Sequence, residues 1–178
     1  HEVQPEAREP RRAGDRQGRG RVVRRVLQVA DGAEQAAFPC LRHRETDRRA
    51  KRSRLLELLG GLIAEGRRVV VFSQFVSMLT LIKADVEQRG WDHAWLTGDT
   101  KDRDGAISRF QTGKTPIFLI SLKAGGSGLN LTAASHVVHF DRWWNPAVEN
   151  QAIDRTHRIG QARKVIAYRL LIKDSIEE

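Results

Sequence analysis

The stretch RVVVFSQFVSMLTLIKADVEQRG, residues 68–90, decides the fold class. Its first part, RVVVFSQF at 68–75, is a continuous run rich in β-branched and aromatic residues, which is typical of a strand buried on both faces. From residue 76 the pattern changes to helical spacing, with apolar Leu79, Ile82 and Val86, and the run stops at Gly90. A buried strand followed directly by an amphipathic helix indicates an α/β protein.

The same alternation continues on both sides of this stretch. Before it, KRSRLLELLGGLIAEG at 51–66 has helical spacing and ends at Gly66. After it we expect strands at 91–98, 116–122, 136–141 and 165–171, and helices at 103–113 and from Asn145 (N-cap) and Pro146 to about 159. Such alternation predicts a parallel sheet with helices on both faces, and therefore three layers. Ligands of these sheets bind beyond the carboxyl ends of the strands, so we expect the loops after 69–72, after SLK and after HFD to form the working edge.

The beginning of the chain has a different composition from the rest. Residues 1–50 hold twelve arginines and no lysine, and all seven lysines follow them. The opening EAREPRRAGDRQGRGR has no apolar period, so we expect residues 1–49 to be a basic segment that is disordered or irregular. Within it, VVRRVLQVA at 22–30 is compatible with either a helix or a strand. We expect the globular domain to occupy residues 50–178.

The charge balance favours a polyanionic partner, nucleic acid first. The formal net charge is +9 and the pI is about 10.5, although a solvated basic surface gives the same values. The single cysteine, Cys40, excludes an intramolecular disulfide framework and a cysteine-rich zinc site. No apolar run approaches the roughly 18–20 residues that span a bilayer. The bias toward arginine indicates a GC-rich bacterial gene, and we expect a cytoplasmic or nucleoid location.

A glycine loop, AGGSGLN at 124–130, follows one of the expected buried strands. Glycines let the backbone approach a phosphate closely, and the exposed amides then donate to the anion. Ser121 and Lys123 add a hydroxyl and a positive charge beside the loop. A tight strand-to-helix turn without a ligand has the same composition, so the loop alone is a weak signal.

An arginine pair, Arg155 and Arg158, lies in QAIDRTHRIGQ at 151–161. At i and i+3 both side chains share one face of the expected helix, with Gln151 one turn earlier. Phosphoryl transfer needs cations opposite the departing phosphate, and guanidinium groups supply charge and directed donors. A solvated basic helix face is the alternative. Asp154 is a candidate to anchor one arginine or to cap the turn.

Two further features are open to more than one interpretation. Of Trp143 and Trp144, between a strand end and a helix start, one is a candidate to lie near a nucleic-acid backbone or base, and the alternative is that both are packed. His157 has no second ligand at a ligand-like spacing, so we expect no metal site.

Five blocks in one order resemble a known family. They are FSQF (72–75), LTGDTKDRDGAISRF (96–110), SLKAGGSGLNLTAA (121–134), DRWWNPAVENQAIDRTHRIGQ (141–161) and YRLLIKDSIEE (168–178). Together they resemble the C-terminal RecA-like lobe of the Swi/Snf-type ATPases in helicase superfamily two. The resemblance covers residues 51–178, and HRIGQ combined with WWNP is specific to that group.

The resemblance implies a function and a set of site residues. Members are ATP-dependent translocases of double-stranded DNA, whose two RecA-like lobes hold ATP between them. The second lobe brings the arginines of motif six, here Arg155 and Arg158, to the γ-phosphate. The resemblance assigns the following to the DNA side: Gln74, Thr97, Gly98, Ser121, Lys123, Gly125 and Trp144. It assigns the following to the nucleotide and interlobe side: Gly128, Asn130, Gln151 and Asp154.

The chain also departs from a complete motor of this kind. It contains neither a G-x-x-x-x-G-K-[ST] loop nor a D-E-x-H box. The resemblance therefore implies that ATP and Mg²⁺ are held mainly by an N-terminal lobe, which is the expected partner together with duplex DNA. We predict that this polypeptide alone does not hydrolyse ATP. Ser127 in place of the family's valine, and LTGDT in place of the commoner LDGST, are mild changes.

Two other classes of protein are weighed against the motor lobe. A RecA-like module that grips duplex DNA without a catalytic partner fits the charge equally well. A doubly wound enzyme that binds a cofactor phosphate needs G-x-G-x-x-G after its first strand, whereas AGGSG follows the third expected strand. The DNA-binding module is therefore the stronger alternative.

Overall fold

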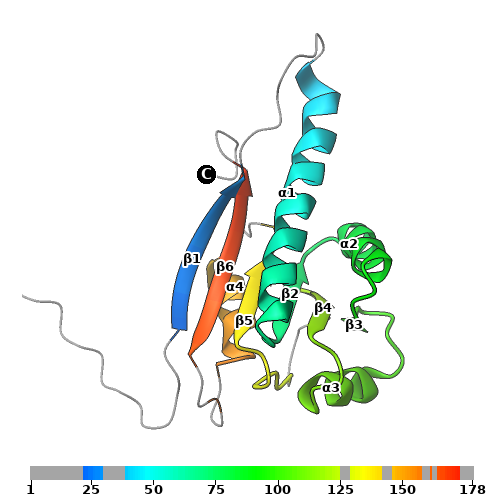
Figure 1. Cartoon of the computed structure of the whole chain (residues 1–178), viewed down its shortest axis with the longest axis vertical. Helices are drawn as coiled ribbons and strands as arrows, with labels where there is room; N and C mark the ends of the chain where they lie inside the picture. Colours follow the sequence, from blue (N-terminus) through cyan, green and yellow to red (C-terminus); the bar gives the residue numbers. More distant parts are fainter. Residues whose placement is uncertain are drawn as a thin grey trace, which may run out of the picture.

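A computed structural model describes residues 22–29, 39–124, 129–141, 146–157, 161 and 164–172, which form a parallel sheet covered by helices (Figure 1). The strands are β1 (Val22–Val29), β2 (Val69–Ser73), β3 (His93–Leu96), β4 (Ile117–Ser121), β5 (His136–His139) and β6 (Val165–Ile172). The helices are α1 (Pro39–Ala64), α2 (Val76–Gln88), α3 (Arg103–Gln111) and α4 (Pro146–Asp154). The order in the sheet is β1-β6-β5-β2-β4-β3, and every pair is parallel.

The sheet separates two apolar clusters, which confirms the expected three layers. Successive β2 residues point to opposite faces, so Val69 and Val71 lie in one cluster and Val70 and Phe72 in the other. Apolar residues of α1 and α2 complete the first cluster, and residues of α3 and α4 complete the second. Figure 1 shows α1 across the near face of the sheet and α4 behind it. The α/β class and the RecA-like layering follow from this arrangement.

The predicted helix ends at glycine are confirmed. Gly66, Gly90 and Gly113 follow α1, α2 and α3 with φ angles of +67°, +68° and +83°. This left-handed conformation strains residues that carry a Cβ, and glycine adopts it without that cost. Each glycine therefore ends a helix and turns the chain toward the next strand.

The N-terminal segment differs in part from its expected irregularity. Residues 22–29 form β1, which pairs with β6 from Val22↔Val165 to Val29↔Ile172, and α1 already begins at Pro39. The strand alternative for 22–30 is therefore the one observed. As an edge strand, β1 is at most half-buried over residues 22–28, so its sequence lacks the continuous apolar run of β2. The pairing with β6 supplies the order that the local pattern does not show.

Helix α4 ends earlier than expected, at Asp154 instead of about residue 159. The amides of Arg155 and Thr156 donate to Ala152 and Ile153, three residues back, at 3.3 and 3.0 Å. The Thr156 hydroxyl also donates to the Ile153 carbonyl at 2.8 Å. These bonds tighten the last turn and close the helix, so Arg155 lies in a turn after α4, while Arg158 lies outside the described residues and the face it was expected to share stays a prediction.

Helix α1 is held to α2 by a bidentate ion pair. Arg52 donates to Asp85 from Nε at 2.7 Å and from a terminal nitrogen at 2.9 Å.

Among the described residues, no helix combines the length and the apolar character that crossing a bilayer requires.

Candidate functional site

The expected working edge exists as the shared carboxyl end of four strands. We use the name carboxyl edge for residues 74, 97–98, 121–124 and 141, which end or follow β2, β3, β4 and β5. Because all strands are parallel, these loops come from distant parts of the chain and meet at one side of the sheet. The structure thus brings together Gln74, Thr97, Gly98, Ser121 and Lys123.

Asp141 ties two of the quoted motifs together at this edge. Its carboxylate accepts hydrogen bonds from the Ser73 hydroxyl and, at 3.0 Å, from the backbone amide of Gln74. The Leu122 amide in turn donates to the Ser73 carbonyl at 3.0 Å. The first residue of DRWWNP therefore fixes the loop that carries Gln74.

The loop after β4 is held from two sides. The Ser121 hydroxyl accepts from the Ala124 amide at 3.2 Å, and Arg103 of α3 donates to the Ala124 carbonyl at 2.8 Å. Ser121 is only 2 % exposed and Thr97 only 4 %, whereas Gly98 and Lys123 are exposed and Gln74 is half-buried. An incoming ligand at this edge thus meets Gly98, Lys123 and Gln74, and the buried hydroxyls shape the loops.

A second group of candidate residues lies at the other end of the sheet. Helix α4 starts beyond the carboxyl end of β5 and returns along the sheet, so its last residues approach the amino ends of the strands. Gln151 and Asp154 are exposed on α4. We call residues 155–157 the arginine turn; within it Arg155 is 5 % exposed.

The arginine turn is bonded to the residues that follow the glycine loop. We call residues 129–134 the connecting segment. The Leu131 amide donates to the Arg155 carbonyl at 2.9 Å. Gln111 of α3 holds the same segment, since its side chain donates to the Asn130 carbonyl at 2.7 Å and accepts from the Ala133 amide at 2.9 Å. Asn130 itself is exposed.

Gln161 is a member of this group that sequence reasoning missed. Its side chain is 2 % exposed, and its amide nitrogen donates to the carbonyls of Thr132 and Ala134, both at 2.8 Å, and of Thr156 at 3.2 Å. The only signal in the sequence is that Gln161 closes the HRIGQ block. Nothing in the spacing predicts which carbonyls it reaches.

Some predicted residues lie outside the described residues. They are Gly125, Gly128, Trp144 and Arg158, together with the neighbouring Trp143 and Asn145. The remaining candidates form two groups, one at the carboxyl edge and one around the arginine turn. This division matches the one that the family resemblance makes between the DNA side and the nucleotide side. The chemical roles stay predictions.

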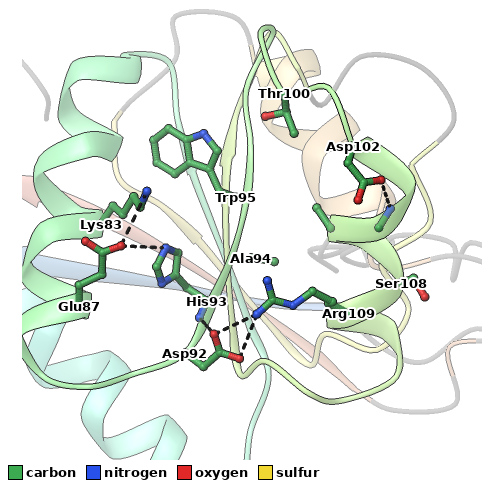
Figure 2. A pocket seen from close by; sticks show the side chains of 12 residues that line it. Lys83, Glu87, Asp92, His93, Ala94, Trp95, Thr100, Asp102, Ser108 and Arg109 are labelled. Atoms are coloured by element: carbon green, nitrogen blue, oxygen red, sulfur yellow. Dashed lines mark hydrogen bonds and ion pairs between the residues drawn. The ribbon is translucent and has the colours of Figure 1, made fainter.

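A hollow of about 700 Å³ lies elsewhere, beside β3 and between α2 and α3 (Figure 2). Most of its charged side chains have partners in the fold: Glu87 lies 3.7 Å from Lys83 and 3.8 Å from the His93 ring, Asp92 pairs with Arg109 at 3.2 Å, and the Asp102 carboxylate accepts from the Gly105 amide at 2.8 Å. Because these charges already have partners, the hollow offers few groups for a charged ligand.

In the part of the chain that the structure describes, no cluster of three or more His, Cys, Asp or Glu residues could hold a metal ion.

Two buried histidines lie in β5. Burial, with a smaller contribution from Arg169, lowers the pKa of His139 to about 4. Its ring stacks on Phe72 with centroids 5.7 Å apart, and within the described structure its Nε2 is buried without a hydrogen-bond partner. Burial, followed by the charge of Arg67, also lowers the pKa of His136. Both rings are therefore neutral packing groups near neutral pH.

Comparison with known proteins gives a consistent family. The family described as the helicase conserved C-terminal domain matches residues 50–160. The candidate ATP-dependent helicase/translocase YwqA of Bacillus subtilis (strain 168) is 44 % identical over 134 residues, covering 74 % of this chain and 14 % of YwqA. The chain thus spans about a seventh of that relative's length.

Solved structures agree with this match. The C-terminal part of the Fun30 ATPase domain superimposes with a TM-score of 0.68 at 36 % identity, covering 72 % of this chain and 43 % of that one. The Sulfolobus solfataricus SWI2/SNF2 ATPase core in complex with dsDNA gives a TM-score of 0.62, also at 36 % identity, covering 72 % of this chain and 27 % of that one.

Proposed function

The chain belongs to the helicase conserved C-terminal domain family, in its Swi/Snf branch, and on this premise we propose that it is the second motor lobe of an ATP-dependent translocase of double-stranded DNA. The observation that carries the proposal is the arrangement of the block at 121–134. One end of this block lies at the carboxyl edge, and the other end is bonded to the arginine turn. A single stretch of chain thus joins the surface proposed for DNA to the residues proposed for ATP.

On the nucleotide side, the proposal gives this lobe positive charge but no phosphate cradle. The sequence lacks a phosphate loop and an acidic metal-binding box, so these residues fit ATP and Mg²⁺ only as the second half of a shared site. Arg155 and Arg158 would neutralise charge that develops on the γ-phosphate during transfer to water. Gln151, Asp154, Asn130 and Gly128 would line the interface between the lobes.

The burial of Arg155 supports different duties for the two arginines. Arg155 is 5 % exposed, and a buried guanidinium needs partners within the fold, because an unpaired buried charge is costly. We propose that Arg155 both holds the arginine turn in shape and contributes positive charge near the γ-phosphate. We assign the direct phosphate contact to Arg158.

On the DNA side, the proposal assigns phosphate contacts to the accessible members of the carboxyl edge. Lys123 supplies a charge, and Gln74 and the backbone at Gly98 supply polar contacts. Ser121 and Thr97 would act by fixing the loops, and Gly125 and Trp144 complete the proposed set. The Sulfolobus SWI2/SNF2 core was solved with dsDNA, which supports a duplex as the ligand.

The experiment is a DNA-dependent ATPase assay of the full-length protein and of the 178-residue chain. We expect duplex DNA to stimulate turnover by the full-length protein, and we expect no turnover by the chain alone. Turnover by the chain alone would contradict the proposed division of the site.

A DNA-binding module without turnover is the second candidate, and the net charge of +9 favours it as much as it favours the motor. It predicts duplex binding by the full-length protein without ATPase activity. The same assay therefore separates the two functions. A bacterial protein of either kind would act in the nucleoid.

A further inference from the structure

The side chain of Gln161 bridges the arginine turn and the connecting segment. Its amide nitrogen lies 2.8 Å from the Thr132 carbonyl oxygen, 2.8 Å from that of Ala134 and 3.2 Å from that of Thr156. Two of these acceptors belong to the connecting segment and the third to the arginine turn. A primary amide has two N–H donors, so the third contact shares a hydrogen with the other two.

This bridge is buried, which makes the donors hard to replace. Gln161 is 2 % exposed and Ala134 and Thr156 are both fully buried, so water has little access to the carbonyls of Ala134 and Thr156. A buried carbonyl that loses its donor stays unsatisfied, which disfavours the arrangement that buries it. The amide of Gln161 therefore selects the position in which the turn and the segment lie together.

A second bond repeats the same connection. The Leu131 amide donates to the Arg155 carbonyl at 2.9 Å, so the connecting segment is also bonded directly to the backbone of Arg155. Displacement of the connecting segment would thus shift the backbone of Arg155. Gln111 of α3 also holds the connecting segment, and within the described residues its side chain bonds to Asn130 and Ala133 and not to residues 155–157.

We propose that Gln161 is a positioning residue that makes the arginine turn and the connecting segment move as one body. The inference rests on the proposed function, in which the arginine turn contributes to ATP hydrolysis and the block that begins at Ser121 contacts DNA. Gln161 then transmits DNA engagement to the arginines and touches neither ligand. Its loss uncouples turnover from DNA binding and leaves each ligand's own contacts in place.

The test compares Gln161→Met with Gln111→Met in the full-length protein. Both changes keep the length of the side chain and remove an amide that bonds to the connecting segment, but only Gln161 reaches the arginine turn. The readouts are the kcat of ATP hydrolysis at saturating duplex DNA and the Kd for the same duplex. Because a misplacement of about 1 Å can cost about 100-fold in rate, we expect Gln161→Met to lower kcat by about 10- to 100-fold. We expect the Kd to stay within about twofold, because the variant removes no proposed DNA contact. A 10-fold increase in the Kd would indicate that a DNA contact is lost.

Gln111→Met is expected to keep kcat within about threefold, because in the described part of the chain the Gln111 side chain bonds to Asn130 and Ala133 only, and its loss leaves the Gln161 bridge and the Leu131–Arg155 bond in place. An equal loss of kcat in both variants would overturn the proposal, because it would show a general effect of loosening the segment. A loss of DNA affinity as large as the loss of turnover would overturn it as well.

Gln161→Asn covers the case in which Gln161→Met does not fold. It keeps the amide but shortens the side chain by one methylene, so it cannot reach all three carbonyls. Hydrogen exchange in a peptide covering 129–134 reads the geometry directly, and the Leu131 amide should exchange faster in Gln161→Asn than in the unmodified protein. Unchanged exchange together with unchanged kcat would overturn the proposal. Failure of the proposed function is a different result, since the unmodified full-length protein would then lack DNA-stimulated turnover.

Discussion

The carboxyl edge and the arginine turn differ in how the chain builds them. At the carboxyl edge, each loop is placed by the strand before it, and parallel pairing brings the strand ends together. The arginine turn follows a helix that stops at Asp154, and it is fixed by bonds to the end of α4, to the connecting segment and to Gln161. A site of the first kind follows from fold topology. A site of the second kind depends on a few side chains and backbone bonds between residues distant in sequence.

The largest expected effect comes from a change on the nucleotide side, which should lower ATP turnover and leave DNA binding intact. Arg158→Ala in the full-length protein should lower ATP turnover by about 1,000-fold or more, since an arginine of this kind acts on transition-state charge. Affinity for duplex DNA should stay nearly unchanged. Steady-state ATPase kinetics and a DNA titration measure the two quantities.

Arg109→Ala is the matched control for that change. Arg109 is exposed on α3 and pairs with Asp92 at 3.2 Å, away from both regions. Its loss should affect neither quantity. Normal turnover in Arg158→Ala with a large loss of DNA binding would reverse our assignment of the two regions.

Acidification should weaken the sheet beneath both regions together. His139 stays neutral in the folded chain down to a pKa of about 4, whereas in the unfolded chain it binds a proton near its ordinary value of 6.5. The unfolded state therefore binds more protons between pH 6.5 and 4, and stability falls as the pH drops through that window, by about 3 kcal/mol in all. Urea unfolding between pH 7 and 5 measures the slope.

His139→Leu should flatten this dependence, because the neutral packing group no longer titrates. Part of the slope remains, since burial also lowers the pKa of His136 and acts in the same direction. An identical slope in the variant would mean that His139 is not protonated on unfolding in this range.

The Asp141 carboxylate tests how far the carboxyl edge depends on side chains. Asp141→Ala removes the acceptor for the Ser73 hydroxyl and the Gln74 amide, and we expect a stability loss of about 1–3 kcal/mol. The loop that carries Gln74 should also lose its position, so DNA affinity should fall. Thermal unfolding and DNA titration check both effects.

Asp99→Ala provides the comparison, since Asp99 is an exposed carboxylate directly after Gly98 of the carboxyl edge. Both variants remove one negative charge near the proposed DNA surface, which by itself favours binding. Weaker binding in Asp141→Ala than in Asp99→Ala isolates the loop effect. Equal affinities would show that topology alone fixes the edge.

The smallest expected effect concerns one exposed lysine. Lys123→Ala should weaken DNA binding and reduce the slope of log K against log salt by about one unit, as expected for one phosphate contact. Lys114→Ala is the control, because Lys114 is exposed at the opposite end of β4. Equal slopes in the two variants would remove Lys123 from the DNA side.

The sequence predicts most of this fold because its signals are local. Buried strands such as β2 and β4 are continuous apolar runs, and Gly66, Gly90 and Gly113 mark helix ends by their backbone freedom. The carboxyl edge followed from these elements and the parallel topology. Strand β1 was harder, because an edge strand carries arginines and gains its order from β6.

The arginine turn shows why the rest was not predictable. Residues 151–161 have a helical pattern, yet the bonds of Thr156 and Leu131 end the helix and hold the turn. Gln161 bonds to three carbonyls, of which two lie 29 and 27 residues earlier in the chain. Long-range hydrogen bonds of this kind leave no periodicity in the sequence.

The paired charges around the hollow of Figure 2 have a consequence for solubility. Strand β3 ends the described sheet and is only four residues long. An open strand edge invites pairing with another molecule, and short strands with charged side chains beside them discourage it. Lys83, Glu87, Asp92 and Arg109 stand next to this edge. A neighbouring chain that added a strand there would have to desolvate or separate these ion pairs, and this disfavours aggregation through the β3 edge.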